Sequence, residues 1–147
     1  MDYYHLFPDK TYAKIQSDDV LVRMINAEKT FSGARSVGLT VINGIRISTV
    51  FLCIDHSFAS FSSTKHDYTR PVMWECMIFG GKFDSGCWRA SGSVRNARLL
   101  HIRKVKLVLA KEFNLVIKNN EVLAQAFDLG FDVTSLVRTN VRTRKRK

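Results

Sequence analysis

The chain has 147 residues, of which 46% are hydrophobic and 24% charged, and this length and composition are typical of one folded domain. They exclude a disordered or fibrous protein, and the absence of an 18-residue apolar run argues against a membrane-spanning helix. The net charge is +10, and six of the basic residues lie in the last ten positions. We therefore expect one domain at residues 1–137, followed by a basic tail at residues 138–147.

Three cysteines are an odd number and form no C-x-x-C pair, so a disulfide framework is not expected. The first residues lack the basic and apolar regions of a secretory signal. These observations predict reduced thiols and a cytoplasmic location, without a membrane or a cofactor.

The first predicted elements are short strands at residues 3–7 and 12–15, separated by a turn at Pro8. Ser17, followed by two aspartates, predicts the start of a helix, because a hydroxyl accepts from free N–H groups and acids favour the positive end of the helix dipole. Gly33 is a plausible end of that helix.

A β-hairpin is the clearest local prediction. Asn43-Gly44 tolerates the positive φ angles of a type I′ turn and separates apolar strands at residues 39–42 and 45–54. The second half of the latter strand is apolar on both faces, which indicates a central position in the sheet.

A serine-rich loop is expected at residues 55–70, then a strand at residues 72–79 that ends at Gly80-Gly81, and a second loop at residues 84–92. Together with the hairpin, this predicts an α+β fold with a small antiparallel meander of three or more strands and packed helices.

A long helix is predicted from Ser91 or Ser93 to Phe113, although its second half also has alternation compatible with a strand. A short helix is expected at residues 121–127. Residues 131–137 are expected to form a strand or an irregular packing segment.

Two blocks, Arg46 to Phe58 and Met73 to Asp84, followed by Trp88-Arg89 and a serine-led helix, resemble a family of small proteins encoded in bacteriophage and prophage genomes. The resemblance covers about residues 37–110. It implies a phage-type origin and a shared strand–loop–strand–helix core, and it implies no activity. Members of that family usually have glycine at the position of Cys53.

Asp55 and His56 stand where an apolar strand meets a loop, and the predicted sheet brings them near the strand that contains Glu75. One interpretation is an acid/base or metal group of these three residues, with His66 or Asp67, because a carboxylate can orient a histidine of near-neutral pKa. The alternative is structural: Asp55 caps a turn and His56 binds a backbone carbonyl. A zinc site of Cys53, His56, Cys76 and Cys87 is disfavoured by the spacing.

Basic residues gather in the predicted long helix and in the tail, as contact with a phosphate backbone would require; the alternative is that they form an ordinary solvated face. The candidate nucleic-acid-binding residues are Arg89, Arg95, Arg98, Arg103, Lys106, Arg138, Arg142, Arg144, Lys145, Arg146 and Lys147. The candidates for base stacking are Tyr68, Trp74 and Trp88. No motif for sequence-specific reading is present.

The sequence therefore favours a non-enzymatic, phage-type accessory protein that binds nucleic acid or a ribonucleoprotein. Two alternatives stay open. One is a protein that binds and inhibits or redirects a host factor, and the other is a small hydrolase or metal-dependent enzyme that uses Asp55, His56 and Glu75.

Overall fold

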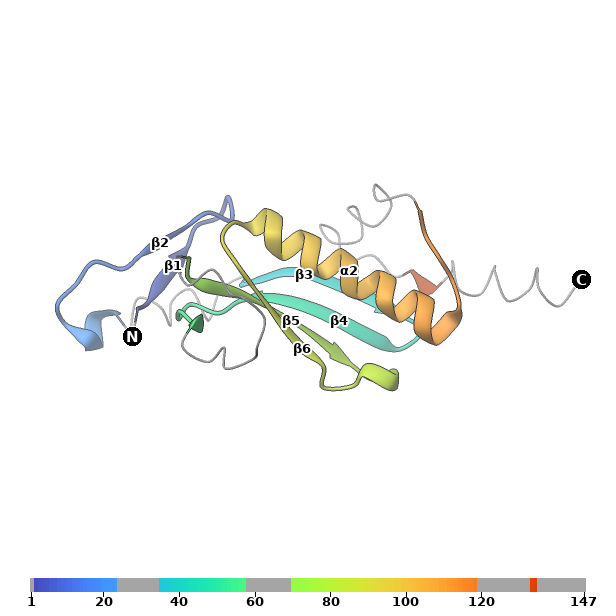
Figure 1. The fold of residues 1–147 in the computed structure, drawn as a ribbon. Helices are drawn as coiled ribbons and strands as arrows, with labels where there is room; N and C mark the ends of the chain where they lie inside the picture. The colour runs from blue at the N-terminus through green and yellow to red at the C-terminus, as the bar shows by residue number, and fades with distance from the viewer. Residues whose placement is uncertain (1, 24–34, 58–69, 119–132, 135–147) are drawn as a thin grey trace, which may run out of the picture.

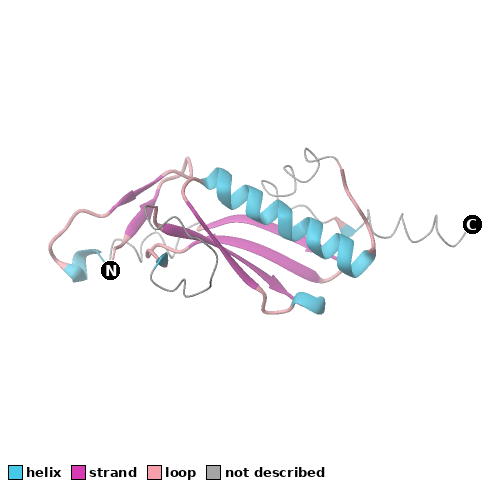
Figure 2. Ribbon diagram, viewed as in Figure 1, coloured by secondary structure: helices cyan, strands magenta, loops and turns pink. Residues whose placement is uncertain are grey.

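A computed structural model describes residues 2–23, 35–57, 70–118 and 133–134 of the chain. Antiparallel strands and one long helix make up this part, which confirms the predicted α+β class (Figure 2). The elements are β1 (Tyr4–Leu6), β2 (Tyr12–Lys14), β3 (Ser36–Ile42), β4 (Ile45–Phe51), β5 (Val72–Phe79), the 3₁₀ turn η2 (Gly81–Phe83), β6 (Cys87–Ser91) and α2 (Val94–Phe113).

The first two strands form a separate two-stranded sheet, as the aromatic run and its turn predict. The hairpin of β1 and β2 is joined to the segment that follows β4, because Tyr4 N–H donates to the carbonyl of Cys53 over 2.8 Å. The helix expected after Ser17 begins at residue 20, and Asp19 caps it by accepting from Leu21 N–H over 2.8 Å. The predicted continuation to Gly33 lies outside the described residues.

The hairpin of β3 and β4 turns at Asn43 and Gly44, whose φ angles are 48° and 85°. Both values are positive, as a type I′ turn requires, and Ile42 pairs with Ile45 across it. β4 then lies between β3 and β5 in the four-stranded meander, which confirms the central position predicted from its apolar second half.

The second predicted loop is wrong, because residues 87–91 form β6, the fourth strand of the meander. Its alternation is weak in the sequence: only Trp88 and Ala90 lie on the face of β6 toward α2, and polar or small residues occupy the other face. Glycines flank the strand and suggest a loop. Gly86 leaves room for the ring of Trp88, since a Cβ at position 86 would lie 2.4 Å from that ring.

The long helix spans Val94–Phe113, in agreement with the prediction, and the left-handed residue Asn114 ends it. It lies along one face of the meander (Figure 1). Its buried residues follow helical spacing. Those from Ile102 to Leu109 pack on strand residues such as Ile47 and Ile78 in one hydrophobic cluster, and Ala97 belongs to a second cluster. The buried helix residues are Ala97, His101, Ile102, Val105, Val108 and Leu109.

A second, aromatic cluster joins the small sheet to the meander. The Tyr12 ring lies 5.6 Å from the Phe51 ring and 6.0 Å from the Trp74 ring, measured between centroids. Trp74 is fully buried. The cluster therefore fixes the N-terminal hairpin against the ends of β4 and β5.

Two residues of the segment expected at 131–137 are described. Val133 is buried and its N–H donates to the carbonyl of Val41 over 3.0 Å, while the hydroxyl of Thr134 accepts from Asn43 N–H over 2.7 Å. These contacts support the packing interpretation. The helix expected at residues 121–127 lies outside the described residues.

Candidate functional site

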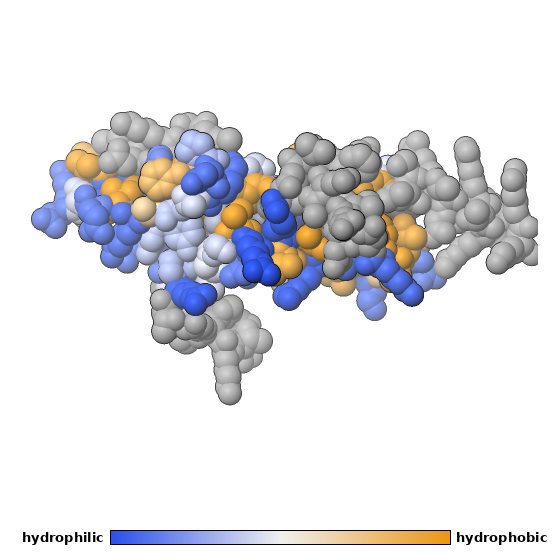
Figure 3. Space-filling model, turned by 90° about the horizontal axis from the view of Figure 1, so that it is seen from above, coloured by the Kyte–Doolittle hydropathy of each residue, from blue (hydrophilic) through white to orange (hydrophobic). Residues whose placement is uncertain are grey.

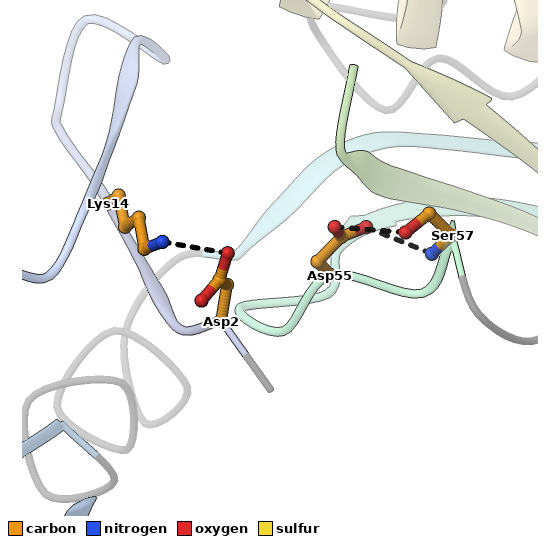
Figure 4. A network of polar contacts seen from close by, with 4 residues as sticks. All are labelled: Asp2, Lys14, Asp55 and Ser57. Carbon is orange, nitrogen blue, oxygen red and sulfur yellow. Dashed lines mark hydrogen bonds and ion pairs between the residues drawn. The ribbon is translucent and has the colours of Figure 1, made fainter. Parts of the chain in front are cut away.

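Asp55 stands four residues after the end of β4 and makes the contacts of a structural carboxylate. One of its oxygens accepts from the N–H groups of Ser57 and Val72, each over 2.9 Å. The other oxygen accepts from the Ser57 hydroxyl over 3.0 Å (Figure 4). Asp55 therefore closes a turn and ties the end of β4 to the start of β5, as the structural alternative predicts.

Glu75, the second predicted acid, forms an ion pair across two strands. It lies opposite Arg89 in the register of β5 and β6, and Arg89 Nε lies 2.9 Å from Glu75 Oε2. Two-thirds of the Arg89 side chain and most of the Glu75 side chain are shielded from water, so salt screens this pair only partly. Arg89, predicted as a nucleic-acid contact, thus has an internal carboxylate partner.

His56 lies within electrostatic range of both acids. Burial is the main cause that lowers its pKa, the charge of Arg89 acts in the same direction, and Glu75 and Asp55 oppose them. The fold therefore brings Asp55, His56 and Glu75 into one region, as predicted. The carboxylates there are engaged with backbone and with Arg89, and an acid/base role for the three residues stays a prediction. His66 and Asp67 lie outside the described residues.

The cysteines do not gather into a ligand set. Cys53 and Cys76 are buried, which raises the pKa of each thiol to about 11. Cys87 is exposed, and partial desolvation together with the nearby Glu75 raises its pKa to about 11 as well. In the part of the chain that the structure describes, no three His, Cys, Asp or Glu side chains are grouped as a metal site would require.

A buried polar group that the sequence did not indicate lies between α2 and the sheet. His101 is fully buried, with its Nε2 2.8 Å from the Thr40 hydroxyl and its Nδ1 2.8 Å from the Thr49 hydroxyl. Desolvation lowers the pKa of His101 to about 4, so the ring is neutral at pH 7. A histidine and two threonines at such separations in the chain have no local signal, and only the pairing of β3 with β4 brings them together.

The outer surface of α2 is strongly basic. The helix contains six basic residues and one acid, Glu112, which stands in its last turn. Arg95, Arg98 and Arg103 are exposed, and Lys106 is half-buried. Neither ion pair found among the described residues involves Arg95 or Arg103. The three arginines are thus exposed residues of one helix, and their contact with nucleic acid stays a prediction.

Of the predicted stacking aromatics, the two that the structure describes do not form an exposed platform. Trp74 is wrong as a candidate, because it is fully buried and its ring N–H donates to the carbonyl of Gly92 over 2.6 Å. Trp88 is half-buried, and the ammonium group of Lys104 lies 3.8 Å from its ring centroid. Tyr68 and the basic residues from Arg138 to Lys147 lie outside the described residues.

A pocket of about 290 Å³ lies beside the basic surface, between β6 and the first half of α2. Seen from above in Figure 3, hydrophobic and strongly hydrophilic residues lie next to one another in the middle of the molecule. Ala90 and Ser91 of β6 line the pocket together with Val72, Arg89, Asn96, Leu99, Leu100 and Arg103. The pocket thus has Arg103 and Asn96 beside the aliphatic side chains of Leu99, Leu100 and Val72, while the Arg89 side chain is paired with Glu75.

Comparisons with protein-family models, with curated proteins and with solved structures found no match. Among the described helices, none has the length and apolar character needed to cross a membrane.

Proposed function

We propose that this chain is a non-enzymatic, phage-type accessory protein that binds nucleic acid or a ribonucleoprotein through the exposed surface of α2 and the basic C-terminal residues. The observation that carries the proposal is the charge of α2, where six basic residues stand against one acid and Arg95, Arg98 and Arg103 are exposed. The six basic residues of positions 138–147 add to that charge in the sequence.

Cations held on one rigid helix are suited to a phosphate backbone. Each phosphate that they neutralise releases counterions, so affinity is gained without reading the bases. The buried side of α2 is anchored by residues such as Ala97, Val105 and Val108, which hold the arginines on the outer side. The meander then acts as a scaffold that presents the helix.

The sheet itself is a poor candidate for the contact surface. Modules that bind single strands on a sheet stack bases on exposed aromatic residues. Here Phe51 and Trp74 face the core, and Arg89 is paired with Glu75. This arrangement favours the helix over the sheet as the binding element.

The test is a binding titration of the full chain against fluorescein-labelled RNA and DNA of mixed sequence, repeated over a series of salt concentrations. We expect the dissociation constant to rise steeply with salt. Arg95→Gln with Arg103→Gln should reduce the slope of log K against log salt by about 1.4 for a single strand, since each lost phosphate contact contributes about 0.7.

The matched control removes the same charge elsewhere, by Arg46→Gln with Lys118→Gln, both exposed positions outside α2. A full-length variant with the basic residues of positions 142–147 changed to glutamine measures the share of the tail. Weak binding that neither salt nor any of these variants changes would contradict the proposal. Capture of a host protein that persists after nuclease treatment, without nucleic-acid binding, would favour the host-factor alternative.

A further inference from the structure

The pocket between β6 and α2 has a defined size, and it brings aliphatic side chains next to the basic residues of α2. Its volume of about 290 Å³ is at the lower end of the pockets that hold small molecules, which span about 300–1,000 Å³. It therefore accommodates one small unit, and a folded segment would not enter it.

One wall of the pocket is aliphatic. Leu99 projects from α2 with 44% of its surface exposed, and Leu100 and Val72 continue this wall toward the core. Contact of this exposed leucine with water is unfavourable, and a flat apolar group that covers the side chain would remove that unfavourable contact. The wall thus favours a ligand with an apolar face.

Polar and basic side chains lie on the other side of the pocket. Arg103 is exposed on α2, and Arg89 borders the pocket while its Nε is used in the pair with Glu75. A Cβ at Gly92 would lie 2.9 Å from Asn96 Nδ2 and 3.9 Å from Arg70 Nη1, so a further guanidinium reaches the same corner. These groups favour an anion, and the first turn of α2 contains no acid that would oppose it.

Asn96 adds a directional contact. Its Nδ2 donates to the carbonyl of Ser91 over 2.8 Å, which fixes the orientation of the amide. The amide oxygen is then the acceptor that this side chain offers to the pocket. An amide at the edge of an aliphatic wall is the kind of group that binds the edge of a nucleobase.

We propose that this pocket binds one unstacked nucleotide of a single-stranded nucleic acid, with the base against Leu99, Leu100 and Val72 and the phosphate on Arg103. The inference rests on the proposed function, since it assigns the strand type and the point of insertion on the same surface. A double helix keeps its bases stacked and paired, so it can contact the arginines of α2 without filling the pocket.

The first experiment detects the pocket directly, by an NMR titration of the full chain with adenosine monophosphate and, separately, with inorganic phosphate. We expect adenosine monophosphate to shift the backbone amide signals of Asn96, Leu99 and Arg103 and to saturate at millimolar concentration. Inorganic phosphate should shift these signals less at equal concentration, because it lacks the base. Equal effects of both ligands, or shifts elsewhere on α2, would overturn the proposal.

The second experiment separates the apolar contact from the charge. Leu99→Ser should weaken binding of a labelled 15-nucleotide single strand about fivefold, leave its salt dependence unchanged, and have no effect on a duplex of the same length. Val116→Ser is the matched control, because Val116 is 73% exposed and lies outside the pocket.

Arg103→Gln should weaken single-strand binding about tenfold and reduce the salt slope. Lys118→Gln, which removes one exposed charge outside α2 and outside the pocket, is its control and should change neither. If Leu99→Ser acts equally on single strand and duplex, or like its control, the pocket inference fails while polyanion binding stands. If the unmodified chain binds neither form in a salt-dependent way, the proposed function itself fails.

Discussion

The polar group around His56 and the polar group around His101, both in the part of the chain that the structure describes, differ in how they are built. The group at the end of β4 has Asp55 and His56 adjacent in the sequence, and Asp55 binds its neighbour Ser57 and the start of β5. The group beneath α2 joins His101 to Thr40 and Thr49, which stand 61 and 52 positions away. The first is local and partly exposed, and the second is long-range and fully buried.

The difference shows that an acid next to a histidine in the sequence does not by itself indicate catalysis. Here both oxygens of the Asp55 carboxylate accept hydrogen bonds that close a turn. The difference also shows that His101, whose pKa is lowered strongly enough to lie at about 4, is the histidine that no sequence pattern indicated. In the buried group each hydroxyl satisfies one ring nitrogen, so the histidine acts as part of the core.

The largest effect is expected from His101→Leu. The change leaves the hydroxyls of Thr40 and Thr49 buried without the ring, and an unsatisfied buried polar group costs about 1–3 kcal/mol. We expect the free energy of unfolding to fall by about 3 kcal/mol in urea denaturation. Changing the two threonines to valine in the same chain should recover most of the loss, because no polar group then stays unpaired. A single variant as stable as the unmodified chain would contradict the role given to this network.

Acid should destabilise the fold through the same ring. The pKa of His101 is about 4 in the folded state and 6.5 unperturbed, so the unfolded state takes up a proton first as the pH falls. Stability is constant above pH 6.5 with respect to this group, falls between pH 6.5 and 4, and levels off below, with a total loss of up to about 3 kcal/mol. Urea denaturation at pH 7.5 and 4.5 measures it. His101→Gln retains a hydrogen-bonding side chain without titrating, and a slope that persists in this variant would assign the effect elsewhere.

The strand-end group should give a smaller effect. Asp55→Ala removes an acceptor used by three donors, and we expect a loss of about 2 kcal/mol in the free energy of unfolding. Asp55→Asn keeps one oxygen for the two backbone N–H groups and should lose less. Equal losses in the two variants would show that charge, and not the turn, is what this position needs.

The smallest effect concerns Cys53, which follows β4. Its φ angle is 63°, in the left-handed region that favours glycine. We expect Cys53→Gly to be more stable than Cys53→Ala by about 1 kcal/mol, the reverse of the order in regular structure. Differential scanning calorimetry of the two variants measures this, and a more stable alanine variant would contradict it.

Elements with strong local signals were predictable. The hairpin at Asn43-Gly44 depends on two residues that tolerate positive φ, and α2 depends on a long stretch without glycine or proline, so both are visible in the sequence. β6 was not, because an edge strand with one large core residue, Trp88, has no clear alternation between its flanking glycines. Trp74 was misplaced as an exposed aromatic because a single strand does not reveal which of its faces α2 covers.

The sequence by itself determined the α+β class, the basic character, the central hairpin, and the arginines on one helical surface, since these depend on contacts within a few residues or on composition. Only the tertiary structure decided that Arg89 is paired, that His101 is buried between two threonines, and that a pocket opens beside Arg103. Those properties depend on which strands pair and which face the helix covers, and residues far apart in the chain determine both.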